Sequence, residues 1–135
     1  MNNNMNSRTV TIVVAASQRH VFDFLSRIEN LPAWATEFCE GLRKVDGHWK
    51  VVTSAGELFF RIDAHAETGV IDMFGGLTLE QMAVFPVRVL ALPTGQTAVS
   101  FTFFQLPGMP DQLYERQYKS LVIEMQGLRR RFSPA

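Results

Sequence analysis

The sequence predicts an α+β fold in which a curved antiparallel sheet of seven strands surrounds a long C-terminal helix, with two short helices between strands one and two. Three observations carry this prediction: a β-branched first segment followed by helical spacing, a long stretch of alternating apolar residues broken by turn signals, and a closing amphipathic segment. We expect residues 8–135 to form a single domain and the Asn-rich residues 1–7 to form a disordered tail.

The first elements follow from local signals. Residues 8–15 are rich in β-branched side chains and predict a strand. Ser17 stands at the N-cap position of a helix whose apolar residues recur at steps of three and four from 21 to 28. Pro32 ends this helix, and residues 32–38, which include Trp34, are expected to form the second short helix.

Residues 40–106 alternate between apolar and polar side chains, which is the two-residue period of β-strands. Turn signals divide the stretch into six strands, and the short connections favour antiparallel pairing of neighbours. We interpret five short segments as hairpin turns: Asp46-Gly47, Ala55-Gly56, Thr68-Gly69, Gly75-Gly76 and Pro93-Thr94-Gly95.

Residues 110–132 carry the pattern of one long amphipathic helix, and Pro110 suits its first turn because a missing N–H costs nothing there. The side expected to face the sheet carries Tyr114, Tyr118, Leu121, Val122, Met125, Leu128 and Phe132. The three arginines at 129–131 end the helix, where the helix dipole favours cations. We therefore interpret them as a solvated helix end and not as a nucleic-acid site.

The composition excludes several classes of protein. Thirteen basic residues balance thirteen acidic ones, so no net charge attracts nucleic acid. No apolar stretch is long enough to span a membrane, and the N-terminal residues lack the pattern of a secretory signal. Cys39 is the single cysteine, which excludes an intrachain disulfide. We expect it to be a buried thiol in a reducing compartment, and the protein to be cytoplasmic.

Several short motifs occur in a characteristic order. They are VFDFL at 21–25, ENLPAW at 29–34, GVID at 69–72, RV at 88–89, FTFF at 101–104 and LPGM at 106–109. With the order of elements, they resemble the START-like (SRPBCC) superfamily, and within it a branch of polyketide cyclase or dehydrase-like proteins. The resemblance implies the helix-grip fold. It also implies that the function is either ligand binding or catalysis, because the superfamily hosts both.

The apolar face of each predicted strand is expected to line a cavity beneath the long helix, because alternate side chains of a strand point to opposite sides. Phe60, Ile62 and Ala64 form one such inner set, and Trp34 and Phe38 are placed near the entrance. The candidate ligand-binding residues are Trp34, Phe38, Trp49, Phe60, Ile62, Ile71, Met73, Phe85, Val87, Phe101, Phe103, Gln105, Tyr114, Gln117, Tyr118 and Leu121.

Few ionisable groups are expected on this inner face. The branch that the sequence resembles carries a His after the Gly-Val-x-Asp stretch, where this chain has Met73. Among the remaining polar candidates, Tyr114 and Tyr118 are the two that could act as hydrogen-bond donors or acids in catalysis. Asp72 and Arg88 are interpreted as a structural tie between strands.

Neither a metal nor a cofactor is expected. The three histidines, His20, His48 and His65, have no partner at metal-ligand spacing. His65 shares a strand face with Asp63, but we place this face on the solvent side. The sequence contains no phosphate-binding loop, dinucleotide fingerprint or nucleophile elbow.

Three functional hypotheses follow. The first is a binding protein for a small hydrophobic molecule, such as a polyketide, quinone, lipid or aromatic metabolite, held in the cavity. The second is a polyketide cyclase or dehydratase that acts by shaping its substrate, with Tyr114 or Tyr118 as donor. The third is a protein-interaction module on the same fold, and a homodimer is compatible with all three.

Overall fold

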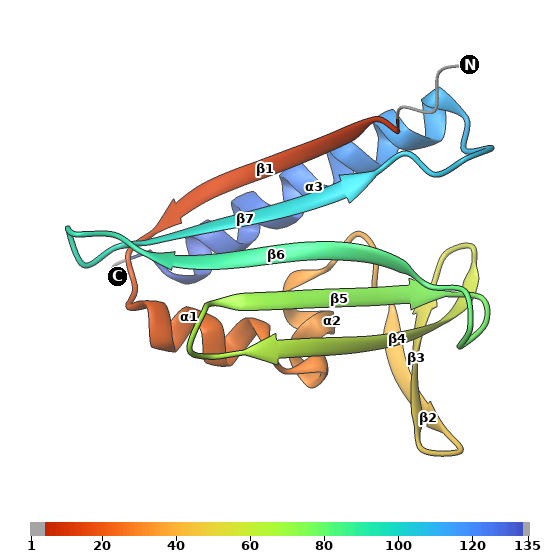
Figure 1. Ribbon diagram of the computed structural model, residues 1–135, viewed down its shortest axis with the longest axis horizontal. Coiled ribbons are helices and arrows are strands. Elements are labelled where there is room, and N and C mark those ends of the chain that lie inside the picture. Colours follow the sequence, from red (N-terminus) through yellow and green to blue (C-terminus); the bar gives the residue numbers. More distant parts are fainter. Residues whose placement is uncertain (1–4, 134–135) are drawn as a thin grey trace.

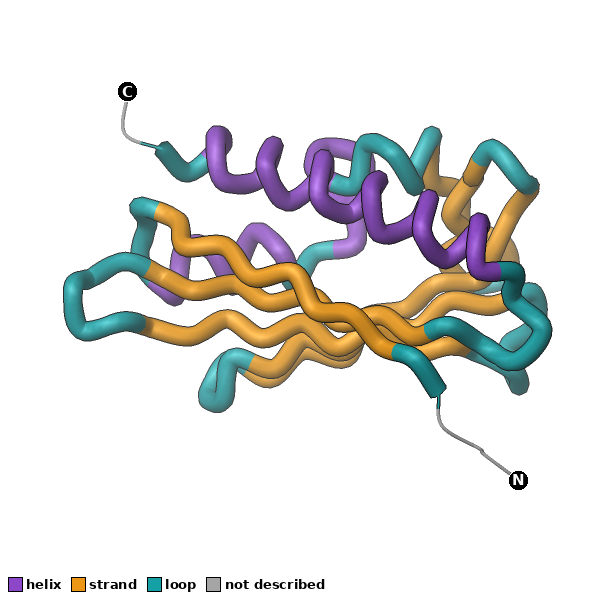
Figure 2. The backbone as a smooth tube through the Cα atoms, turned by 90° about the horizontal axis from the view of Figure 1, so that it is seen from above, coloured by secondary structure: helices purple, strands orange, loops and turns teal. Residues whose placement is uncertain are grey.

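The computed structural model describes residues 5–133, which form a seven-stranded antiparallel sheet with the helices on one of its faces (Figures 1 and 2). In chain order the elements are β1 (Ser7–Val14), α1 (Gln18–Leu25), a 3-10 turn η1 (Ile28–Asn30), α2 (Leu31–Trp34), β2 (Gly41–Val45), β3 (His48–Thr53), β4 (Gly56–His65), β5 (Val70–Gly76), β6 (Ala83–Ala91), β7 (Thr97–Phe104) and α3 (Asp111–Arg131). The predicted α+β helix-grip architecture is confirmed.

The strands follow the order β1-β7-β6-β5-β4-β3-β2, and every neighbouring pair is antiparallel. Strands β2 to β7 are therefore a meander, as predicted, and β1 is added at the edge beside β7. The β1–β7 pairing is complete, with Ser7 opposite Phe104 and Val14 opposite Thr97. Of the expected tail at 1–7, residues 1–4 lie outside the described residues, whereas the Asn6 amide donates to Gln105 Oε1 at 2.7 Å.

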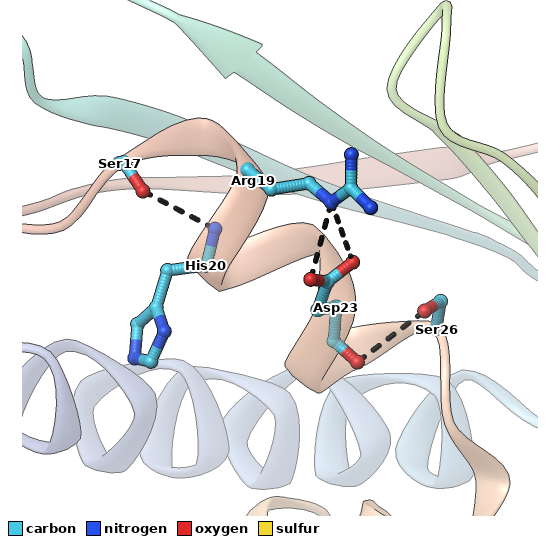
Figure 3. Close-up of polar contacts among 5 residues, drawn as sticks. All are labelled: Ser17, Arg19, His20, Asp23 and Ser26. Atoms are coloured by element: carbon cyan, nitrogen blue, oxygen red, sulfur yellow. Dashed lines mark hydrogen bonds and ion pairs between the residues drawn. The ribbon is translucent and has the colours of Figure 1, made fainter.

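Helix α1 begins as the sequence predicts. The Ser17 hydroxyl accepts a hydrogen bond from the backbone N–H of His20 at 3.2 Å, and Arg19 pairs with Asp23 one turn later (Figure 3). The His20 ring points toward α3, where it meets the ring of Phe132 edge-on at 5.4 Å between centroids. This contact fixes one end of α3 against α1.

Both short helices end earlier than predicted. Helix α1 stops at Leu25, and the Asn30 side chain donates to the free carbonyl of Phe24 at 2.9 Å, which satisfies one of the acceptors that the helix end exposes. Helix α2 ends at Trp34, because Ala35 leaves the helical region at φ −87° and ψ 55°. The backbone N–H groups that follow bind a side chain of α3, described below, instead of continuing the helix.

The Gly75-Gly76 pair is not the predicted hairpin turn. Both glycines lie in β5, and the connection to β6 follows at residues 77–82. A Cβ atom on Gly76 would overlap the carbonyl oxygen of Gln81, and one on Gly75 would meet the Phe60 ring at 3.3 Å. Glycine is therefore needed at these two positions because neighbouring atoms lie too close for a side chain, and not because the chain turns there.

The predicted faces of the sheet are confirmed at most positions. Ile71, Met73, Val87, Val99 and Phe103 are buried beneath the helices. On the other face, Arg88 pairs with Asp72 at 2.8 Å across the strands, and this confirms the predicted structural tie.

Two further residues of the sheet refine the assignment of faces. Ala64 was expected in an apolar inner set but is exposed, because β3 pairs with β4 only as far as Phe59 and leaves the rest of that edge open. Asp63, on the solvent side as predicted, pairs with Arg61 at 2.7 Å.

Candidate functional site

A cavity of about 390 Å³ lies between the sheet and the helices α2 and α3. Seven elements contribute to it, and their side chains are mostly apolar. The lining residues are Leu31, Trp34, Ala35, Glu37, Phe38, Thr53, Ser54, Ala55, Leu58, Phe60, Met73, Phe85, Phe101, Phe103, Leu113, Arg116, Gln117, Ser120, Leu121 and Glu124.

The burial of these residues distinguishes the inner part of the cavity from its mouth. The buried lining residues, among them Trp34, Phe60, Met73 and Phe103, form the inner part of the cavity. The exposed lining residues lie on the loop between α2 and β2, on the turn between β3 and β4, and on the first half of α3; they are Glu37, Ser54, Ala55, Leu113, Arg116 and Gln117. The cavity therefore opens between these three segments.

Aromatic rings form much of the wall. The ring of Phe38 lies 6.0 Å from that of Phe60, and Phe101 meets both Trp34 and Phe85 at 6.2 Å between centroids. Phe60, Phe85 and Phe101 face inward because the alternation of their strands turns them toward α3. Rings at these distances pack favourably with one another and offer a broad apolar surface to a bound molecule.

One buried carboxyl group, that of Glu124, belongs to this cavity, and it was not among the few polar candidates expected on the inner face. Glu124 is buried, and its Oε2 atom accepts hydrogen bonds from the backbone N–H groups of Glu37 and Phe38, each at 3.0 Å. Burial raises the pKa of Glu124 to about 7. The two N–H donors act in the opposite direction, and the charge of Glu37 raises the pKa further. Glu124 can thus hold or release a proton near neutral pH.

The structure brings together nine of the predicted ligand-binding residues around the cavity, namely Trp34, Phe38, Phe60, Met73, Phe85, Phe101, Phe103, Gln117 and Leu121. Ile71 and Val87 are instead fully buried in the core. Ile62 is half-buried against the core, and Trp49 lies 5.1 Å from the Lys44 ammonium, away from the lining. Gln105, Tyr114 and Tyr118 gather elsewhere.

These last three residues lie near Arg8. The Arg8 guanidinium lies 4.3 Å from the Tyr118 ring and 5.3 Å from the Tyr114 ring, and it pairs with Glu115 at 2.7 Å. Tyr114 and Gln105 line a second hollow of about 370 Å³, also bounded by Asn6, Ser7, Arg8, Asp111 and Glu115. Neither tyrosine lines the main cavity, whereas Phe103 lines it and contacts both tyrosine rings. The geometry thus gives the tyrosines no direct contact with a molecule in the main cavity.

The sequence did contain a signal for the residue that was missed. Glu124 comes three residues after Leu121 and four before Leu128, so it occupies the apolar side of α3. A carboxylate at such a position is rarely buried without a partner. Its partners are backbone groups of a loop, and those groups leave no mark in the sequence.

The seven-stranded sheet, the long helix across it and the cavity between them define a START-like helix-grip fold. Comparison with solved structures confirms this fold, because START superfamily and ARO/CYC structures are among those that match it. No protein-family model matches the sequence, and no curated protein does.

Three solved structures illustrate the likeness. The di-domain ARO/CYC BexL of the BE-7585A biosynthetic pathway has 12% identity and a TM-score of 0.73, covering 93% of this chain and 46% of that one. The Aha1 dimer from Colwellia psychrerythraea has 15% identity and a TM-score of 0.71, with 96% and 97% covered. A START superfamily protein from Mycobacterium smegmatis has 14% identity and a TM-score of 0.66, with 96% and 97% covered. At such identities the likeness concerns the fold.

Two further structural findings concern the residues 5–133. In that part of the chain no helix has both the length and the apolar character needed to cross a membrane. Within the same residues, no three His, Cys, Asp or Glu side chains converge as metal ligands do.

Proposed function

We propose that this protein binds a small, mainly apolar molecule in the cavity between the sheet and α3. The observation that carries the proposal is the cavity itself, with about 390 Å³ of space and a wall of aromatic and aliphatic side chains. Ligand sites of proteins commonly measure about 300 to 1,000 Å³ and combine an apolar lining with a few polar groups. A polyketide, quinone, lipid or aromatic metabolite is the class of molecule that fits such a lining, and a cytoplasmic location remains part of the proposal.

The fold supports the proposal at a coarser level. The chain shares its architecture with a START superfamily protein and with part of the di-domain ARO/CYC BexL. In this chain the cavity lies beneath the long helix, and apolar side chains form most of its lining. The particular residues of this chain then decide what is bound.

Filling the cavity tests the proposal directly. Ser120 lines the cavity from α3, so Ser120→Phe should place a ring in the space that a ligand needs. We expect the variant to bind the neutral fluorescent probe N-phenyl-1-naphthylamine at least about tenfold more weakly than the wild type, as loss of most apolar contact implies. Fluorescence titration measures the affinity of each protein for the probe.

Gln126→Phe is the matched control, because it adds the same ring to an exposed position of the same helix outside the cavity lining. The control should retain the wild-type affinity. Equal affinity of the wild type and Ser120→Phe, or no binding of the probe by the wild type, contradicts the proposal. Native mass spectrometry of protein from its source, with organic extraction, then identifies the bound molecule.

A second candidate function is catalysis within the same cavity, and Glu124 is the observation that favours it. A carboxyl group with a pKa of about 7 can act as a general acid or base at neutral pH. The donor in a cyclase or dehydratase would then be Glu124, because Tyr114 and Tyr118 lie outside the cavity. Turnover of a bound polyketide that disappears in Glu124→Gln while binding remains would support this role.

The protein-interaction hypothesis gains less from the structure. Trp34 is buried, so it adds no exposed apolar patch. Leu77 and Leu79, in the connection between β5 and β6, are exposed, and β1 and β2 are open edges of the sheet. A homodimer remains a proposal that sedimentation velocity can test, since self-association through these edges would double the mass.

A further inference from the structure

Among the residues that the structure describes, Glu124 is the single charged side chain that is buried, and it lies in the wall of the apolar cavity. A buried carboxyl group is costly unless its oxygen atoms are hydrogen-bonded. The N–H groups of Glu37 and Phe38 satisfy Oε2. Within residues 5–133, no hydrogen bond reaches Oε1, so the carboxyl group keeps one acceptor oxygen for another donor.

The charges around Glu124 indicate what kind of donor fits. Glu37 lies at the mouth of the cavity on the α2–β2 loop, and its negative charge raises the pKa of Glu124. The charge of Glu124 in turn helps to raise the pKa of the buried Cys39 thiol, after the larger effect of its burial. Glu37 and Glu124 therefore bring two carboxyl groups to this end of the cavity.

The third charged residue of the cavity lining, besides Glu37 and Glu124, is Arg116, which also lies at the mouth. It lies eight residues before Glu124 on α3, which corresponds to about 12 Å along the helix axis. The strand residues of the lining carry no titratable side chain. The end of the cavity next to Glu124 is thus acidic, and the nearest cationic side chain in the lining is two helical turns away.

We propose that this cavity selects apolar molecules that end in a protonated amine, and that Oε1 of Glu124 accepts a hydrogen bond from the amine. The inference rests on the proposed function, since it assigns the polar end of the same ligand. An amine in this place gains a charge-assisted hydrogen bond in an apolar setting, where such bonds are stronger than in water. A ligand that ends in a carboxylate would be repelled there by the negative charges of Glu37 and Glu124.

Three probes with the same apolar body test the proposal: 4-phenylbutylamine, 4-phenylbutan-1-ol and 4-phenylbutanoate. Each is titrated at pH 8 against protein loaded with N-phenyl-1-naphthylamine, and displacement gives its affinity. We expect the amine to bind at least about tenfold more tightly than the alcohol, and the carboxylate to bind most weakly. In Glu124→Gln the advantage of the amine over the alcohol should fall to about twofold or less.

Glu115→Gln is the matched control, because it removes a carboxylate from the same helix outside the cavity lining. This variant should keep the full preference for the amine. Equal affinities of the three probes, a preference that survives in Glu124→Gln, or tightest binding of the carboxylate overturns the proposal. Tightest binding of the carboxylate would assign the polar end to Arg116 instead.

A measurement on the wild type alone keeps the test decisive if Glu124→Gln does not fold. Because the pKa of Glu124 is about 7, the carboxyl group gains a proton between pH 8 and pH 6. The affinity ratio of amine to alcohol should therefore fall severalfold over this range, and a constant ratio contradicts the proposal. If the dye binds but the amine does not displace it, this inference fails alone; if the dye does not bind, the proposed function fails as well.

Discussion

At the scale of single residues, Glu124 connects two parts of the molecule that are far apart in the sequence. Its carboxyl group on α3 accepts the N–H groups of Glu37 and Phe38, and Phe38 is part of the cavity wall. The same carboxyl therefore anchors the loop that borders the mouth, and in our proposal it also accepts a hydrogen bond from the ligand. A neutral side chain of equal shape can keep the first role and lose the charge that the second requires.

The stability of the protein should depend on pH through this residue. The pKa of Glu124 rises from 4.5 to about 7 on folding, so between these values the folded state holds a proton that the unfolded chain has lost. The free energy of unfolding should fall as the pH rises from about 4.5 to about 7, by at most about 3.5 kcal/mol for this group. Urea unfolding at pH 5 and pH 8 measures the change.

Glu124→Gln removes this group from titration and should show a smaller loss of stability between pH 5 and pH 8 than the wild type. Glu37 on the loop, the Cys39 thiol and Arg116 on α3 are the other ionisable groups around the carboxyl, and all remain in the variant. Glu115→Gln, outside the cavity, should keep the wild-type slope. Identical slopes in the wild type and Glu124→Gln would contradict the assigned pKa shift.

At the scale of elements, the glycines of β5 show how close packing replaces a turn. Gly76→Ala should lower the free energy of unfolding by about 1 to 3 kcal/mol, because the added Cβ would overlap the Gln81 carbonyl and force the chain apart. Gly41→Ala in β2 is the matched control, since no atom lies within 4 Å of its added Cβ. It should change stability by less than about 0.5 kcal/mol. Equal effects of the two substitutions in urea unfolding would contradict this explanation.

Most elements could be predicted because their signals are local. Alternation gave the strands, and Ser17 marked the start of α1 through a hydrogen bond three residues away. The predictions were wrong where contacts between residues far apart in the sequence determine the local structure. The Gly75-Gly76 pair has the sequence of a turn, but the close approach of the Gln81 carbonyl explains it. Helix α2 ends just before the loop whose N–H groups donate to Glu124. The tyrosines of α3 lie on its apolar side, but Arg8 of β1 meets their rings away from the cavity.

At the scale of the whole molecule, the space beneath α3 has a filled half and a hollow half. Helix α1 packs over β6, and the side chains there are completely buried, including Val21, Leu25 and Val87. Beneath the first half of α3 lies the cavity instead of packed side chains. The filled half provides the hydrophobic stability that allows the other half to remain open, because a void costs contacts that the rest of the core must supply.

Substitution of two leucines of α3 can test whether one half is filled and the other hollow. Leu128 is fully buried in the filled half, and Leu121, two turns earlier, lines the cavity. Leu128→Ala should lower the free energy of unfolding by about 3 to 5 kcal/mol, because it opens a new void in close packing. The loss in the free energy of unfolding for Leu121→Ala should be smaller than that for Leu128→Ala by about 1 kcal/mol or more, because its truncation only enlarges an existing hollow. Urea unfolding of the two variants, without added ligand, compares the same substitution in one helix. An equal or greater loss at Leu121 would show that this wall is packed as tightly as the core, and would leave no open space for a ligand.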